Sequence, residues 1–440
     1  MNAVLLAVIV MLVLSLLRVH VVLALSIGAI VGGVVGGLGF LETIEVFSEG
    51  LGGNATVALS YALLGAFAVA ISKTGLPDVM VNVVLRLVGK EGEDRRKTLS
   101  KALLFFVILI ISCFSQNVIP IHIAFIPILI PPILKILNEL EVDRRLIATI
   151  LTFGLTAPYI FLPYGFGQIF HGIIQSNIAD NGLEVTMAEI PTAMALPTIG
   201  LVVGLLFAVF VTYRGPRSYE NREINAEFKQ EEISYSNWTI ACAVVAIVVT
   251  LVVQYYSESM IIAGLAGLMI LFLSGSFNRR EADQAVTEGM KMMAFIGFVM
   301  LTAAGFAAVI RETGHVELLV EQVAAVIGQQ RGLAAMLMLV VGLFITMGIG
   351  SSFSTIPIIA TLFVPLGLAV GFSPMAIIVL IGTAGALGDA GAPASDSTLG
   401  PTAGLNADGQ HNHIWDTCVP TFLHFNIPLL LFGWIAAMML

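Results

Sequence analysis

Charged residues are scarce in this chain. Only 11% of its 440 residues are Asp, Glu, Lys or Arg, whereas 58% are hydrophobic. Soluble domains carry about 25% charged residues, so the composition excludes a soluble globular protein and predicts a polytopic membrane protein in a lipid bilayer. The net charge of -9 does not indicate a nucleic-acid partner, because in a membrane protein the side on which each charge lies matters more than the sum.

Cysteine is equally scarce, and several catalytic motifs are absent. Cys113, Cys242 and Cys418 each lie in or beside an apolar run, which excludes a disulfide framework and a thiolate metal site. The chain has no Walker loop, no His-Glu-x-x-His motif and no Gly-x-Ser-x-Gly motif. We therefore expect neither an ATP-driven pump nor an enzyme, and no cofactor other than a coupling ion.

The chain contains two copies of one sequence unit. The pairs Glu49-Gly50, Phe67-Ala68 and Thr74-Gly75 recur 239 positions later as Glu288-Gly289, Phe306-Ala307 and Thr313-Gly314. The same offset places the segment 112–115 on 351–354, both of which read Ser-x-Phe-Ser. Internal repeats in a membrane protein are typical of secondary transporters.

The apolar runs divide each half in the same way. Residues 1–213 predict spans near 3–17, 21–39, 54–73, 146–163 and 192–212, a re-entrant hairpin at 99–137 and a broken helix at 146–168. Residues 238–440 predict an equivalent set, with a hairpin at 332–370 and a broken helix at 374–400. The hydrophilic stretch 214–237 predicts a cytoplasmic linker. The fold class is thus an all-α membrane protein with about five spans and one hairpin in each repeat.

The basic residues predict the orientation of the two repeats. If the loop with Arg95, Arg96 and Lys97 is cytoplasmic, 18 of the 20 Lys and Arg residues face the same side. An odd number of crossings in each half then inserts the second repeat upside down relative to the first. The prediction is an inverted-repeat protein of the bacterial cytoplasmic membrane with both termini on the extracytoplasmic side. The choice between monomer and homodimer stays open.

Polar residues at the hairpin tips are the first candidate site. Hydroxyl and amide oxygens with freed carbonyls at a helix break are ligands that suit sodium. The alternative is that they only cap or pack helices. The candidates are Ser115, Gln116 and Asn117 in the first half and Ser352, Ser354 and Thr355 in the second.

The broken segment of the second half is the stronger candidate, because it carries two acids. An ionisable group at membrane depth is costly and marks a functional site by default. Asp389 and Asp396 are therefore predicted to bind Na⁺ or a proton, which would compete; the alternative is that either acid caps a helix. The predicted ion- or substrate-binding residues of this segment are Gly388, Asp389, Ser395, Asp396, Ser397 and Thr398.

The matching break of the first half is also made by glycines and prolines, but it has no acid. Thr156, Pro158 and Tyr164 there predict a substrate side suited to a neutral or zwitterionic group. The loop with Asp408, His411, His413 and Asp416 resembles a metal or proton-sensing cluster, but its hydrophilic setting favours an ordinary solvated loop.

The segment Gly-Asp-Ala-Gly-Ala-Pro-Ala-Ser-Asp-Ser-Thr at 388–398 resembles a motif of the NhaC-type Na⁺/H⁺ antiporters. Over nearly its whole length the chain is more similar to the related Na⁺/H⁺ antiporter group that includes a histidine permease. This likeness covers Gly-Leu-Gly-Gly-Asn-Ala-Thr at 50–56, Ser-Gln-Asn-Val-Ile-Pro at 115–120 and Gly-Leu-Thr-Ala-Pro-Tyr-Ile at 154–160. It implies the inverted-repeat fold of the ion transporter superfamily. Ala392 and Ser397 depart from the NhaC-type motif.

Two functions fit these features. One is a secondary transporter that exchanges Na⁺ and H⁺ by alternating access; the other is a Na⁺- or H⁺-coupled importer of an amino acid such as histidine. The buried acids fit both, and the neutral first-half break favours the importer. A passive channel is the remote alternative.

Overall fold

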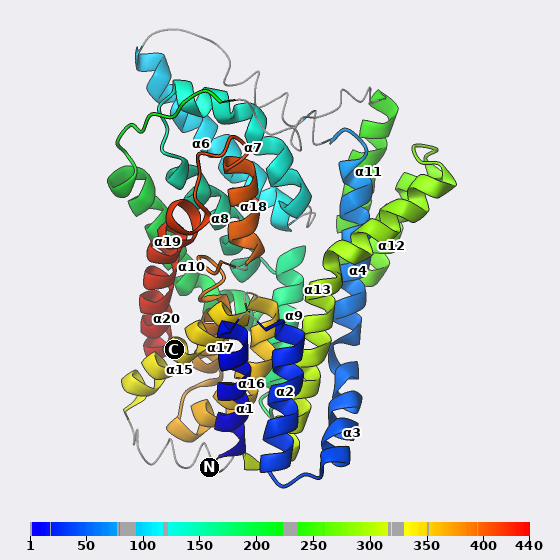
Figure 1. Ribbon diagram of the computed structural model, residues 1–440, viewed down its shortest axis with the longest axis vertical. Coiled ribbons are helices and arrows are strands. Elements are labelled where there is room, and N and C mark those ends of the chain that lie inside the picture. Colours follow the sequence, from blue (N-terminus) through cyan, green and yellow to red (C-terminus); the bar gives the residue numbers. More distant parts are fainter. Residues whose placement is uncertain are drawn as a thin grey trace.

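The computed structural model describes residues 2–17, 19–76, 79, 94–117, 122–222, 236–257, 259–315, 318, 330–349, 352–393 and 395–440. Over these residues the chain is helical and contains no strand. The first half consists of α1 (Ala3–Leu16), α2 (Val21–Val35), α3 (Phe40–Gly50), α4 (Ala55–Ser72), α6 (Asp94–Asn117), α7 (His122–Glu139), α8 (Arg144–Phe161), α9 (Phe166–Asp180) and α10 (Glu189–Phe207) (Figure 1).

The second half repeats this order. It consists of α11 (Asn237–Ser257), α12 (Met260–Leu273), α13 (Arg279–Glu312), α15 (Arg331–Ile349), α16 (Ser352–Val370), α17 (Pro374–Ala386), α18 (Asp396–Leu405), α19 (Val419–Thr421) and α20 (Ile427–Met439). In Figure 1, α1 begins near the lower end of the molecule and α11 begins near the upper end. The sequence predicts two halves that run in opposite directions, and the orientation of the repeats in the membrane stays a prediction.

Three described helical stretches are long and apolar enough to cross a membrane, namely Glu189–Thr212, Asn237–Gln254 and His413–Met439. A fourth candidate is the pair α8 and α9, which are bent by 49° at their break. Shorter apolar helices make up most of the rest. The predicted break of the first half thus lies at residues 162–165, where Pro163 cannot continue the helix.

One predicted boundary is wrong and two helical features were not predicted, whereas the span predicted at 54–73 agrees with α4. The second arm of the broken helix extends to Asp180, well beyond the predicted end at 168, because it is a polar-laced helix with a buried face rather than an apolar run. The span predicted at 54–73 is preceded by α3, whose acidic residues hid it from a search for apolar runs. The counterpart of α3 and α4 in the second half is α13, a single helix of 34 residues that starts at a capping box on Asn278.

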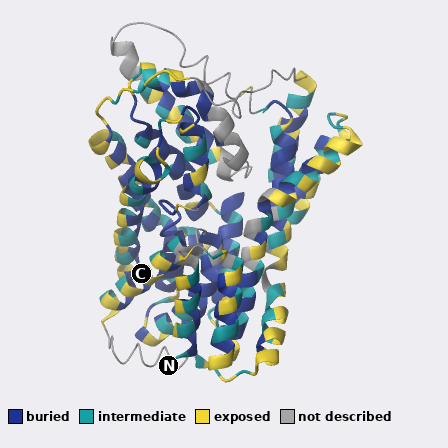
Figure 2. Ribbon diagram, in the orientation of Figure 1, coloured by how far each residue is buried: buried dark blue, intermediate teal, exposed yellow. Residues whose placement is uncertain are grey.

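The helices form two groups. α4 and α13 pack against each other, and α1, α2, α3, α11 and α12 attach to this pair. The other group contains α6 to α10 and α15 to α20, with α17 at its centre. Every residue from Ala376 to Ala386 is buried, and buried residues fill the interior in Figure 2. A helix that is apolar on all sides is surrounded either by protein or by lipid, and α17 is surrounded by protein.

Contacts of α13 with α3 and α4 occur in reciprocal pairs. Gly289 lies against Ala66, and the equivalent position Gly50 lies against Gly305, whose Cα would be 3.0 Å from a Cβ at Gly50. These pairs differ by the same 239-residue offset as the sequence repeat. Reciprocal contacts of this kind are those expected of two units related by a two-fold axis.

Contacts of α2 with α13 and of α12 with α4 follow the same rule. A Cβ at Gly28 would be 3.2 Å from the ring of Phe306, and one at Gly267 would be 2.6 Å from the ring of Phe67. Other glycines of α2 also allow close helix contact, since a Cβ at Gly32 would overlap Ala7 and one at Gly33 would overlap Thr43.

We expect Gly289→Ala to destabilise the protein, because its Cβ would overlap backbone atoms of Ala66 that cannot move aside. Overpacking typically costs about 1–3 kcal/mol. Gly215→Ala is the control, since no atom lies within 4 Å of its added Cβ. Folded yield and SDS-induced unfolding of the purified variants measure the difference. Equal stability of the two variants would contradict the close crossing.

Candidate functional site

The candidate site is built around Asp389, which lies between α17 and α18. The chain leaves α17 at Leu387 and turns at Gly388, whose φ of 87° favours glycine. A Cβ there would also be 2.8 Å from Met347. The turn leaves the Asp389 side chain inside the protein, where the residue is only 8% exposed.

Hydroxyl groups surround the Asp389 carboxylate. Ser395 Oγ donates to Oδ1 at 2.6 Å, and Tyr159 Oη donates to Oδ2 at 2.9 Å. Tyr159 Oη also lies 2.9 Å from Ser352 Oγ, and Ser397 Oγ donates to the Asp389 carbonyl at 2.9 Å. Within the described part of the chain no basic side chain pairs with Asp389. The site is therefore an acid surrounded by neutral oxygens.

Three segments that are distant in sequence meet at this acid. Tyr159 comes from α8 of the first half, Ser352 from the start of α16 and Ser395 from the break itself. Each of these three side chains is at most 1% exposed. A site built from both halves can open to either side when the halves change conformation, as alternating access requires.

The broken backbone is held by buried polar side chains. Asn426 accepts from the Gly388 N–H through Oδ1 at 2.6 Å and donates to the Ala390 carbonyl. Thr398 Oγ1 donates to the Ala392 carbonyl at 2.6 Å, and Thr152 Oγ1 donates to the Ser397 carbonyl at 2.8 Å. These bonds satisfy backbone groups that the helix break frees, which keeps the irregular segment stable in the interior.

The structure brings together five of the residues predicted from the sequence: Ser352, Gly388, Asp389, Ser395 and Ser397. Thr398 supports the break rather than the acid. Asp396 is half-buried in the first turn of α18, and its role in binding Na⁺ stays a prediction. Thr355 is fully buried in α16.

The other predicted residues lie away from Asp389 or have side chains outside the described part of the structure. Thr156 donates to the Thr152 carbonyl of its own helix at 2.8 Å, and Pro158 is buried in the same helix. Tyr164 is 58% exposed and lines a separate cavity. The side chains of the remaining hairpin-tip residues lie outside the described residues: Ser115, Gln116, Asn117 and Ser354.

Sequence reasoning missed Tyr159 and Asn426. Tyr159 is one of only eight tyrosines and follows Pro158 in an apolar helix, which is a weak signal that its hydroxyl has a buried partner. Its ring packs against Phe170 and Phe353 at centroid distances of 5.0 and 5.3 Å. The aromatic contacts fix the direction in which the hydroxyl points.

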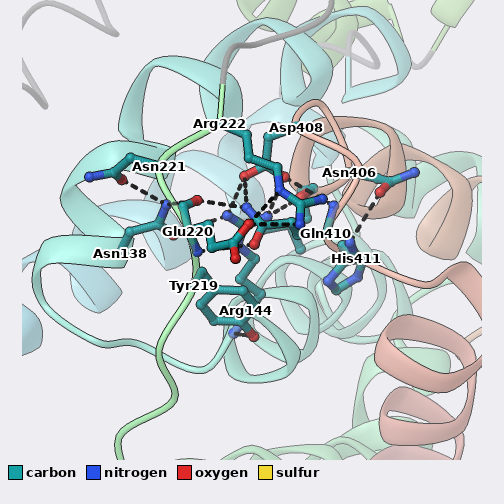
Figure 3. Close-up of polar contacts among 11 residues, drawn as sticks. Asn138, Arg144, Tyr219, Glu220, Asn221, Arg222, Asn406, Asp408, Gln410 and His411 are labelled. Atoms are coloured by element: carbon teal, nitrogen blue, oxygen red, sulfur yellow. Dashed lines mark hydrogen bonds and ion pairs between the residues drawn. The ribbon is translucent and has the colours of Figure 1, made fainter.

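A second polar cluster, of opposite character, lies where α8 begins. Arg144, which is 0% exposed, donates to both carboxylate oxygens of Asp408 at 2.7 and 2.6 Å (Figure 3). The same guanidinium donates to the Leu405 carbonyl at 3.0 Å and lies 4.3 Å from the Tyr219 ring centroid. Two-pronged pairing of this kind is the strong form of an arginine–carboxylate interaction.

The interpretation of this loop as solvated is wrong for Asp408 and His411, whereas His413 and Asp416 are partly exposed. Asp408 and His411 are 7% and 4% exposed, because residues 214–222 of the predicted linker lie across them. Burial lowers the pKa of His411 to about 4, so its ring is neutral at physiological pH. Burial, the largest single influence, raises the pKa of Asp408, but the hydrogen bonds and charge of Arg144 together with the hydrogen bonds from Gln410 outweigh it and hold that pKa below its ordinary value.

Apolar helices throughout, a broken helix in each half and a polar site buried between the halves together define a polytopic membrane transporter. The chain belongs to the Na⁺/H⁺ antiporter family. A model of the Na⁺/H⁺ antiporter family matches residues 150–434, and a model described as the Na⁺-H⁺ antiporter family matches residues 2–88.

Similar proteins agree with this assignment. The chain is 61% identical over its full length and that of YuiF of Bacillus subtilis, which is named as a candidate amino acid transporter. It is 57% identical, again over both full lengths, to an uncharacterized membrane protein of Vibrio parahaemolyticus.

Two solved transporters share the fold. For YdaH of Alcanivorax borkumensis the TM-score is 0.58 at 17% identity, with 89% of this chain and 86% of that chain covered. For MtrF of Neisseria gonorrhoeae the TM-score is 0.59 at 17% identity, with 90% and 84% covered.

Proposed function

We propose that this protein is a cation-coupled secondary transporter that imports an amino acid across the bacterial cytoplasmic membrane. Asp389 carries the coupling ion, Na⁺ or H⁺. Both termini lie on the extracytoplasmic side, and the two repeats are inserted in opposite directions. The reciprocal contacts of Gly50 and Gly289 support this inverted arrangement.

The observation that carries the proposal is the environment of Asp389. A buried carboxylate without a basic partner is stable only if it binds a cation or a proton. Six side-chain oxygens of five residues are linked by hydrogen bonds there, two from Asp389 and one each from Tyr159, Ser352, Ser395 and Ser397. Hard oxygen ligands of this kind suit Na⁺, and a protonated carboxyl could use the same acceptors.

An amino acid as cargo is supported by the name of the relative that is 61% identical. Na⁺/H⁺ exchange without a cargo is the second candidate, favoured by the family assignment and by the same acid. The two differ in one respect. Only the importer needs a site for an organic molecule in addition to the ion site.

Reconstitution into liposomes tests the two candidates. An inward Na⁺ gradient or pH gradient is imposed, and uptake of labelled amino acids is followed while an internal dye reports pH. We expect gradient-dependent accumulation of at least one amino acid above its external concentration. Dye changes that depend on Na⁺ without any amino acid uptake would support exchange, and accumulation indifferent to both gradients would refute ion coupling.

A further inference from the structure

A cavity of about 430 Å³ lies beside the break between α8 and α9, apart from Asp389. Its wall includes Tyr164, Gln168 and Gln175 from the broken segment and Gln254 from α11. None of the residues that line it is ionised. The volume falls within the range of small-molecule sites, and three amides converge in one small space.

The amides are partly paired with one another. Gln254, which is 4% exposed, donates through Nε2 to Gln168 Oε1 at 2.6 Å and to the Gly165 carbonyl at 3.2 Å. Among the described residues, Gln254 Oε1 and Gln168 Nε2 have no other protein partner. One acceptor, on the buried Gln254, and one donor, on the half-buried Gln168, therefore lack a protein partner, and such groups are normally satisfied by a ligand or water.

Phe166 connects this cavity to the buried acid. It follows Gly165 directly at the start of α9, and its ring packs 4.6 Å from Phe353 and 6.1 Å from Tyr159, measured between centroids. Tyr159 in turn donates to Asp389. Gly165 has a φ of 61°, so the turn that places Phe166 depends on glycine.

We propose that the cavity is the recognition site for the side chain of the cargo, and that it selects a neutral side chain that both donates and accepts hydrogen bonds, as a carboxamide does. Free donor and acceptor groups match such a side chain. A cationic or anionic side chain would lose its hydration without a counter-charge, and an apolar one would leave both amides unpaired. This inference rests on the proposed importer and adds its specificity.

A second cavity provides the matched control. It has about 440 Å³ and lies between α6, α8 and α10, with the apolar residues Phe114, Phe153 and Leu162 in its wall. Because the two cavities have similar volumes but opposite polarity, a ligand that binds only in the amide cavity is recognised by polar groups and does not simply fill space.

The test is ligand binding without a gradient, so that it does not depend on transport. Tyr164→Trp places a fluorescent reporter in the amide cavity, and Phe114→Trp places one in the apolar cavity, each compared with the native protein. We expect L-glutamine or L-asparagine to change the Tyr164→Trp emission saturably, L-leucine and L-lysine to leave it unchanged, and Phe114→Trp to respond to none of them.

Two further variants address the role of the amides. Gln168→Leu in the Tyr164→Trp background should weaken binding about three- to tenfold, the effect of one neutral hydrogen bond; Gln254→Met, close in volume, is the second variant. Gln330→Leu, an exposed glutamine elsewhere, should have no effect. A response to L-leucine, no response to either amide, or unchanged binding in both variants overturns the proposal. Saturable binding that never leads to ion-driven uptake refutes the proposed function instead.

Discussion

Asp389→Asn is expected to abolish ion-coupled accumulation while the protein still folds. A cation about 4 Å from a carboxylate gains about 4 kcal/mol at an effective dielectric constant of about 20. Loss of that energy corresponds to a decrease of nearly a thousandfold in ion affinity. The asparagine keeps the shape, and its carbonyl oxygen can still accept a bond from Ser395 or Tyr159.

Uptake driven by a Na⁺ or pH gradient in proteoliposomes measures this effect, with gel filtration as the check on folding. Two further variants provide an intermediate effect and a control. Tyr159→Phe removes one hydrogen bond to a charged group, worth about 1.5–3 kcal/mol. It should therefore raise the half-saturating ion concentration, but by less than Asp389→Asn does. Tyr256→Phe, 81% exposed, should resemble the native protein. Ion-dependent uptake at the native level in Asp389→Asn would remove this acid from the mechanism.

The second-half site could be predicted because its signal is local. Gly388, Asp389 and Ser395 lie within eight residues of one another, in an apolar region where an acid and a broken helix are conspicuous. The polar tip of the second hairpin identified Ser352 in the same way. Local sequence thus indicated which segments break and which acid they carry.

The first-half contribution could not be predicted in the same way. Tyr159 reaches Asp389 across 230 positions of sequence, and a single chain holds no record of which apolar helix faces which. The prediction chose Thr156 because a hydroxyl in an apolar run is unusual, yet its oxygen bonds to its own helix, as threonine in helices commonly does. Helix packing, not composition, decided between the two residues.

The burial of charged residues at helix ends could not be predicted, for a related reason. Arg144 and Asp408 each stand beside a helix end, where charges are usually solvated, and 264 positions separate them. Their burial depends on residues 214–222 covering them, which no local pattern indicates. The pair between Arg144 and Asp408 therefore joins the start of α8 to the end of α18 across the two halves. The opposite ends of the same two helices contribute Tyr159 and Ser397 to the Asp389 site.

We expect Asp408→Asn and Arg144→Met to be strongly destabilising, because each leaves one buried charge without its partner. Breaking a buried pair costs about 3–5 kcal/mol. Lys73→Met is the matched control, since Lys73 and Glu288 form a pair whose side chains are 35% and 41% exposed, and such pairs contribute about 0–1 kcal/mol. SDS titration of the purified proteins gives the differences in unfolding free energy.

The double variant Arg144→Met with Asp408→Leu separates charge from packing. With both charges gone, nothing remains unpaired, so it should be more stable than either single variant. The dependence on pH has a definite sign. Because the folded pKa of Asp408 is lowered, the stabilisation by the pair is complete above pH of about 4 and is lost as the pH falls towards that lowered value. A native protein whose stability relative to Asp408→Asn did not decrease in acid would show that this pair does not stabilise the fold.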